Sequence, residues 1–196
     1  MKRVMDFVLS SIGLILLSPL FLFLMIFISI ESSGGPFYLQ ERVGRNGKTF
    51  KLIKFRSMKA GSDKKGLLTI GSNDARITRT GYFLRKYKVD ELPQLINVFL
   101  GEMSLVGPRP EVKKYTDLYD EEQRKVLTIK PGITDYASLE YFEESDLLKQ
   151  SNNPELTYIQ EIMPAKLKIN LKYVSENSIM GDFNIIWKTI KRILKK

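Results

Sequence analysis

The most constraining feature of this sequence is an uncharged apolar run from Phe7 to Ile30. A helix needs about 20 such residues to cross the hydrocarbon core of a bilayer, so the run is long enough to do so. Secretory signal peptides have a shorter apolar core of about 7–15 residues, which argues against a cleaved signal. The sequence therefore predicts an N-terminal helix that is embedded in a membrane.

Two features bear on how this helix lies in the membrane. Ser18-Pro19 falls in the middle of the run, where proline bends or breaks a helix. Basic residues, which mark the cytoplasmic side, both precede and follow the run. These residues are Lys2, Arg3, Arg42, Arg45, Lys48, Lys51 and Lys54. A re-entrant helix that returns to the face it entered satisfies both observations, but proline is also tolerated in a crossing helix, so both topologies stay open.

The residue types that are missing limit the chemistry of the protein. The 196 residues include no histidine and no cysteine, which excludes disulfides, thiolate nucleophiles and catalysis by Ser-His or Cys-His pairs. Acid–base work therefore falls to Asp, Glu, Lys or Tyr, and a hard cation such as Mg²⁺ is the natural metal. The formal net charge of +9 predicts attraction to nucleic acid, anionic lipid or phosphorylated small molecules.

Two adjacent carboxylates, Asp90 and Glu91, form the candidate site. Pro93 favours the first turn of a helix, so a helix of residues 89–101 is expected, with both acids at its N-terminus. Acids at such a position often do no more than cap the helix. The basic surroundings favour a second interpretation, a site for a metal-bound diphosphate. Arg109, which lies between two prolines, is the candidate arginine for the phosphate oxygens.

Periodicity and turn signals predict the remaining elements. An Asn-Gly turn at residues 46–47 predicts a β-hairpin whose apolar strand positions are Phe37, Leu39, Phe50 and Leu52. A loop is expected at residues 63–74. Helices are expected at residues 77–87, 111–127, 153–174 and 182–196, with a break at Pro164. No repeat or low-complexity linker occurs, so one domain with an embedded anchor is expected.

The last predicted helix, at residues 182–196, is amphipathic. One side carries Ile185, Ile186, Ile190, Ile193 and Leu194, and the other side carries five basic residues. This pattern is typical of a helix on an anionic membrane surface. A helix that packs its apolar side on the protein core shows the same pattern, and the sequence does not separate the two.

Four segments resemble the bacterial sugar transferases, the monotopic phosphoglycosyl transferases. They are KFRSM at 54–58, ITRTGYFLRKYKVDELPQLINVF at 77–99, GEMSLVGPRPE at 101–111 and KPGIT at 130–134. The apolar run with Ser18-Pro19 resembles the re-entrant membrane helix of this family. The resemblance implies an α+β, mainly helical fold with a re-entrant helix broken at Ser18-Pro19, a small β-hairpin, and a helical catalytic domain with interfacial amphipathic helices. Residues 1–31 would form the anchor and residues 32–196 the cytoplasmic catalytic domain.

The resemblance also implies a reaction, the transfer of a sugar-1-phosphate from a UDP-sugar to polyprenyl phosphate with release of UMP. Asp90 would be the nucleophile that holds the phospho-sugar, and Glu91 would bind Mg²⁺ with Asp90 and assist proton handling. Arg109 would hold phosphate oxygens, and the weaker candidates for substrate binding are Pro108, Arg85, Lys54 and Arg56. A helix N-terminus is expected to keep the nucleophile ionised at neutral pH. Membrane lipids are the remaining partners, and a homodimer is left open.

The same resemblance favours re-entry, because a crossing helix with Lys2 and Arg3 inside would separate the catalytic domain from nucleotide-sugars. The expected location is then the cytoplasmic face of the bacterial inner membrane, at the first membrane step of capsule, exopolysaccharide, O-antigen or glycoprotein synthesis.

Two departures from the family pattern limit what can be carried over. The segment Asp135 to Gln150 differs from that of many members, and Asn170 stands where many members have an acid. The sugar, the polyprenyl length, the oligomeric state and the glycan pathway therefore stay unassigned. A non-catalytic membrane adaptor that binds anionic lipid or a partner is the alternative function. Nucleic acid is not an expected partner, since no reader motif accompanies the charge.

Overall fold

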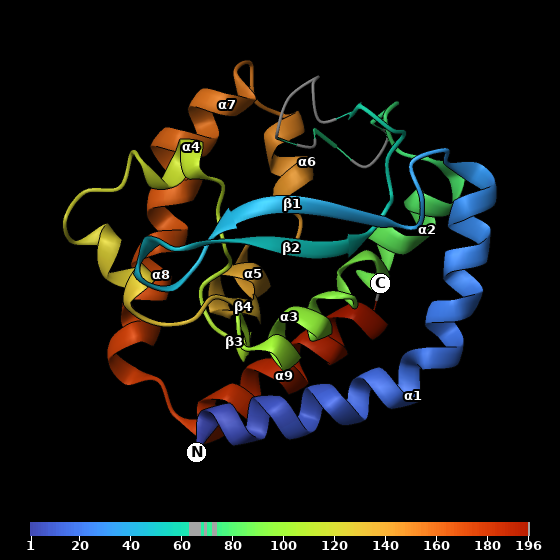
Figure 1. Cartoon of the computed structure of the whole chain (residues 1–196). Coiled ribbons are helices and arrows are strands. Elements are labelled where there is room, and N and C mark those ends of the chain that lie inside the picture. The colour runs from blue at the N-terminus through green and yellow to red at the C-terminus, as the bar shows by residue number, and fades with distance from the viewer. Residues whose placement is uncertain (63–67, 69, 72–73, 196) are drawn as a thin grey trace.

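The structure is a computed structural model that describes residues 1–62, 68, 70–71 and 74–195. Helices dominate these residues, and a two-stranded hairpin lies among them (Figure 1). This agrees with the expected mainly helical α+β fold. The loop expected at residues 63–74 falls largely outside the described residues.

The N-terminal helix α1 (Lys2–Glu31) is the single described helix that is long and apolar enough to cross a membrane. It contains Pro19 and is visibly bent, with one limb along the base of the molecule and the other rising along its edge (Figure 1). The proline thus bends the helix without ending it. Most of its large apolar side chains are exposed, and the buried ones include Phe21, Leu24 and Ile28.

Both ends of α1 bond to the rest of the protein. At the start, Lys2 donates to the buried Asp182, and Arg3 donates to the carbonyls of Val98 and Phe99 at 2.6 and 2.7 Å. At the end, Glu31 accepts the backbone N–H groups of residues 79 and 80 at 2.7 and 2.9 Å. These bonds satisfy amides at the start of the helix α2 (Arg79–Lys86).

The predicted hairpin is confirmed, as β1 (Phe37–Val43) pairs antiparallel with β2 (Thr49–Phe55). Its turn, η1 (Arg45–Gly47), places Asn46 at φ 57° and Gly47 at φ 76°. Asparagine and glycine tolerate this left-handed conformation best, which is why the Asn-Gly signal succeeds.

The helix expected at residues 89–101 is shorter than predicted. The α-helix α3 is Gln94–Leu100, and the acids lie before it in a separate 3₁₀ turn, η3 (Val89–Glu91). Lys88 adopts a left-handed conformation with φ 56°, which reverses the chain between α2 and this turn. The acids are therefore on a tight turn and not in the first turn of the α-helix.

A second, parallel strand pair was not predicted. The strands β3 (Ser104–Val106) and β4 (Gly132–Thr134) are three residues each, too short to show periodicity. Gly132 allows their close approach, since a Cβ there would lie 2.1 Å from the backbone nitrogen of Gly107. This pairing places the Arg109 turn beside the segment that follows β4.

The single helix expected at residues 111–127 is wrong. Two short helices occupy the segment, α4 (Lys113–Thr116) and η4 (Gln123–Thr128). Asp120 accepts the N–H of Gln123 at 2.8 Å, and the Gln123 side chain accepts the N–H of Asp120 at 3.2 Å. This reciprocal cap starts a new helical turn and interrupts the first.

The C-terminal part of the chain is helical. Its elements are α5 (Tyr136–Glu140), α6 (Glu144–Lys149), α7 (Pro154–Thr157), the π-helix η5 (Tyr158–Ile162), α8 (Met163–Glu176) and α9 (Ile179–Leu194). The helices expected at residues 153–174 and 182–196 are confirmed, whereas α5 and α6 were not predicted. The expected break at Pro164 is wrong, because the helix continues through it. The wider π-helical turn comes directly before Pro164 and lets the helix absorb a residue without a backbone N–H.

Helix α9 presents two apolar faces. Ile185 is fully buried against Val106 and Tyr173, as expected of a helix packed on the core. A second set of large apolar side chains is exposed, at helical spacing: Met180, Phe183, Trp187, Ile190 and Leu194. Core packing and an apolar face open to the surroundings therefore occur together in the same helix.

Candidate active site

Asp90 and Glu91 are both buried, with 6% and 9% of their surface exposed. They line a cavity of about 900 Å³ between the hairpin, the α2–η3 segment and helices α5 and α6. Among the described residues, Asp90 Oδ1 has no hydrogen-bond partner. A buried carboxylate oxygen is rarely left unpaired in a structural role, so this atom is available to a ligand.

Glu91, in contrast, is paired with two cations and keeps acceptor capacity for a third partner. Its carboxylate pairs with Lys54 at 3.2 Å and with Arg109 through both terminal guanidinium nitrogens, one of them at 3.0 Å. Burial opposes ionisation of Glu91, yet Arg109 and Lys54 hold the pKa of that carboxyl well below its usual value. Glu91 is therefore a permanent anion that fixes two cations beside Asp90.

The electrostatics of Asp90 differ from the expectation. Burial and the neighbouring Glu91 charge raise the pKa of Asp90, although Lys54, Arg85 and Lys88 counteract part of this rise. A position in the first turn of an α-helix would have favoured ionisation. The 3₁₀ turn gives less of that support, so nearby cations are what keep Asp90 ionisable.

Of the other predicted binding residues, three line the large cavity and one does not. Lys54 contacts Glu91, and burial lowers the pKa of its ammonium group to about 8. Arg85 also lines the cavity. Arg56 lines it too, but its guanidinium donates to the carbonyls of residues 34, 35 and 37, which gives it a structural role in holding that loop. Pro108 lines a different, smaller cavity behind Arg109.

Asp135 supports the arginine turn, although no functional role was predicted for it. This side chain is fully buried, and its Oδ2 accepts the backbone N–H of Arg109 at 3.1 Å. Its Oδ1 accepts the N–H of Ser138 at 2.5 Å and caps helix α5. The available signal was an Asp directly before a helical segment, which predicts a cap but not the bond to Arg109.

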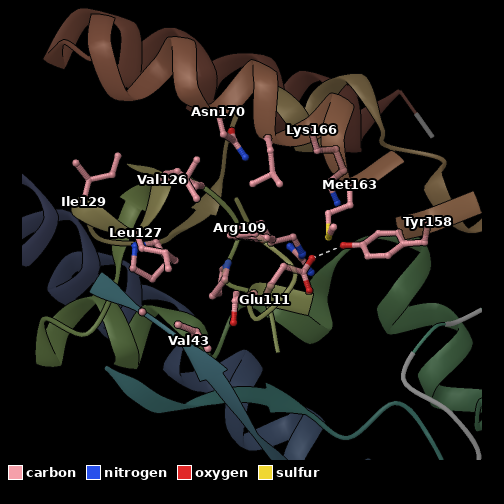
Figure 2. A pocket seen from close by; sticks show the side chains of 17 residues that line it. Val43, Arg109, Glu111, Val126, Leu127, Ile129, Tyr158, Met163, Lys166 and Asn170 are labelled. Carbon is pink, nitrogen blue, oxygen red and sulfur yellow. Dashed lines mark hydrogen bonds between the residues drawn. The ribbon is translucent and has the colours of Figure 1, made fainter. Parts of the chain in front are cut away.

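A polar layer that sequence reasoning missed lies beyond Arg109. Glu111 accepts the hydroxyl of Tyr158 and pairs with Arg42 at 3.3 Å, while Lys166 pairs with Glu144 at 2.6 Å. Figure 2 shows Glu111, Tyr158 and Lys166 around Arg109. These contacts join residues far apart in the chain, so no local pattern announced them.

The pair Asp90–Glu91 is the candidate metal position. Among the residues that the structure describes, no cluster of three or more metal-ligating side chains occurs. Mg²⁺ commonly binds through one or two carboxylates together with substrate phosphates and water, so two carboxylates suffice for it. The unpartnered Oδ1 of Asp90 beside Glu91 fits such an ion.

Comparisons with known proteins place the chain among sugar transferases. The chain is 35% identical to UDP-N-acetylgalactosamine-undecaprenyl-phosphate N-acetylgalactosaminephosphotransferase of Aeromonas hydrophila, over 98% of this chain and 43% of that protein. It is 34% identical to UDP-glucose:undecaprenyl-phosphate glucose-1-phosphate transferase of Escherichia coli (strain K12), over 97% of this chain and 39% of that protein. It is also 34% identical to the Exopolysaccharide production protein ExoY of Sinorhizobium fredii, over 98% and 84%.

This chain thus spans less than half the length of the first two relatives and most of the third. The family described as bacterial sugar transferase matches residues 1–196. The resemblance of the four motif segments is confirmed, and the chain belongs to the bacterial sugar transferase family.

Proposed function

We propose that this protein transfers a sugar-1-phosphate from a UDP-sugar to polyprenyl phosphate, such as undecaprenyl phosphate, and releases UMP. The observation that carries the proposal is the buried Asp90, with an oxygen that no described residue bonds, in a large cavity lined by Lys and Arg side chains. The names of relatives that transfer sugar phosphates to undecaprenyl phosphate support the same reaction class. The name of ExoY supports a place in polysaccharide synthesis.

In the first step, an oxygen of the ionised Asp90 carboxylate attacks the phosphorus that carries the sugar. The bond from that phosphorus to the bridging oxygen of the diphosphate breaks, and UMP leaves with the electron pair. Asp90 then holds the phospho-sugar as an acyl phosphate. Arg109 and Lys54, fixed by Glu91, are placed to stabilise the negative charge that develops on the phosphate oxygens.

In the second step, an oxygen of polyprenyl phosphate attacks the same phosphorus. The bond to Asp90 breaks, the carboxylate re-forms, and the product carries a diphosphate between lipid and sugar. Ping-pong kinetics follow, because UMP leaves before the lipid reacts. Glu91 stays ionised throughout, so its role is to position cations and the metal, in place of the proton handling that the resemblance implied.

Mg²⁺ is the cofactor that we propose for this site. The carboxylates of Asp90 and Glu91 would hold it together with phosphate oxygens of the donor. When bound, it neutralises part of the diphosphate charge and so favours approach of the anionic nucleophile.

We propose further that α1 is re-entrant and that the protein works at the cytoplasmic face of the inner membrane. Lys2 and Arg3 at the start of α1, and Glu31 at its end, all bond to the catalytic domain. A straight crossing would separate these ends by the thickness of the bilayer. The exposed apolar face of α9, flanked by basic residues, supports contact of that helix with an anionic membrane surface.

The topology is tested by cysteine labelling, since the chain has no cysteine of its own. One variant carries a cysteine directly before Met1, and a second carries Ser33→Cys in the exposed turn that follows α1. A membrane-impermeant maleimide should label both only from the cytoplasmic side. Labelling of the two from opposite sides would exclude re-entry.

The reaction is tested by UMP release from protein in nanodiscs, with undecaprenyl phosphate, Mg²⁺ and a panel of UDP-sugars. Release should require Mg²⁺ and should vanish in Asp90→Asn. Mass spectrometry of protein incubated with donor alone should show a phospho-sugar on Asp90. Normal release by Asp90→Asn would overturn the proposed mechanism.

A further inference from the structure

A second cavity, of about 30 Å³, lies on the far side of Arg109 from Asp90. Its walls are mostly apolar, and they come from β1, the arginine turn, α4, η4, η5 and α8 (Figure 2). Four side chains line both this cavity and the large one: Arg109, Glu111, Tyr158 and Lys166. A single layer of side chains therefore separates the small cavity from the substrate cavity.

Asn170 of helix α8 is the uncommitted polar group in this small cavity. Its side chain is directed from the helix toward the space above Arg109 (Figure 2). It is 4% exposed, and within the described part of the chain its Oδ1 has no hydrogen-bond partner. An unpaired buried amide oxygen is costly, so a donor is expected to reach it.

Size and charge limit what that donor can be. A space of this volume accepts about one water molecule. Arg109 and Lys166 in the walls disfavour a cation, and Glu111 disfavours an anion. A neutral molecule that both donates and accepts hydrogen bonds is compatible with all three of these charged side chains.

We propose that the small cavity binds one water molecule, which donates to Asn170 Oδ1 and accepts from the Arg109 guanidinium. The structure gives that guanidinium two hydrogen bonds, both to Glu91 in the large cavity. A guanidinium has five N–H donors, so it has donors left for a water behind it. Asn170 is then a positioning residue that acts through this water to hold Arg109 in the plane that receives phosphate.

The inference rests on the proposed function, because it assigns Arg109 to phosphate binding. The test compares Asn170→Leu, which has a similar volume and no acceptor, with Asn170→Asp, which keeps an acceptor at the same place. In Asn170→Leu the kcat/KM for the UDP-sugar should fall about 10-fold, because Arg109 is no longer held where it binds phosphate. Asn170→Asp should stay within about twofold of wild type.

A high-resolution structure of the wild-type protein supplies a measurement that does not depend on turnover or on variants. Density for a water bonded to Asn170 Oδ1 is expected. The absence of this density would overturn the proposal, and so would a wild-type kcat/KM in Asn170→Leu. An ordered water in a protein that releases no UMP would instead refute the proposed function and leave the water site standing, so the two failures are distinguishable.

Discussion

The two cavities lined by Arg109 both contain buried oxygens that have no hydrogen-bond partner among the described residues. Ser138 Oγ and Asp90 Oδ1 belong to the large cavity and Asn170 Oδ1 to the small one, and the last two make the sharper comparison. Asp90 Oδ1 lies at a cavity of about 900 Å³, and Asn170 Oδ1 at one of about 30 Å³. The first is wide enough for a nucleotide-sugar, while the second accepts about one water molecule. An unpaired atom thus indicates a reaction centre only where the space beside it can admit a substrate.

The chemistry of the two atoms sharpens this contrast. Burial and the Glu91 charge raise the pKa of Asp90. The ionised form of Asp90 therefore destabilises the folded protein. Asn170 is neutral and carries no such charge. Removal of the charge at Asp90 should therefore stabilise the fold. Removal of the acceptor at Asn170 should only make the position of the Arg109 side chain less fixed.

The largest effect is expected from Asp90→Asn. UMP release should fall by at least about 10³-fold, because the amide cannot form the acyl phosphate. The melting temperature should stay level or rise, because the neutral isostere removes a buried charge whose pKa is raised. Activity assays and thermal unfolding of the same preparation check both outcomes. A large drop in melting temperature would show that Asp90 is a structural cap.

The next effect is expected from Glu91→Gln, which removes the anion between Lys54 and Arg109. Breaking such a buried cluster should lower the free energy of unfolding by about 3 kcal/mol, since two cations are left unpaired. Activity should fall as well, because both cations lose their positions. Denaturant titration measures the loss. The matched control is Asp117→Asn, whose exposed ion pair with Lys113 should contribute less than about 1 kcal/mol.

The sequence supported the parts of this site that local signals specify. The adjacent acids, the basic segment before them and the Asn-Gly hairpin that carries Lys54 were all predicted and found. Arg109 was predicted from a rigid turn, and the structure brings it to Glu91. Each of these residues is marked by its immediate neighbours in the chain, which is the range over which sequence patterns act.

The parts that were missed depend on distant segments. The parallel pair of β3 and β4 joins strands of three residues, and only this pairing brings Asp135 to the backbone of Arg109. The continuous helix through Pro164 depends on a π-helical turn, which no periodicity specifies. The small cavity is formed by segments that are far apart in the chain, from β1 to α8, so nothing local marked Asn170 as a neighbour of Arg109.

A pH profile distinguishes the roles of the charged groups around the large cavity. Activity should fall as pH drops through the raised pKa of Asp90, because the protonated carboxyl is not a nucleophile. It should also fall as pH rises through about 8, where Lys54 loses its charge. Lys54→Arg keeps the charge at higher pH, so the alkaline limb of kcat/KM should move upward while the acid limb stays in place. An unchanged alkaline limb would remove Lys54 from substrate binding.

The smallest effect is expected from Asp135→Ala, which removes the acceptor of the Arg109 backbone N–H. The variant loses the cap of α5 and the acceptor for the Arg109 N–H, so the free energy of unfolding should fall by about 1 kcal/mol. The KM for the UDP-sugar should rise more than kcat falls, because Arg109 is displaced while Asp90 is untouched. Asn153→Ala, which removes the cap of α7, is the control that costs similar stability away from Arg109. Equal KM values in the two variants would show that Asp135 supports only its helix, and that Arg109 is held by its side-chain contacts alone.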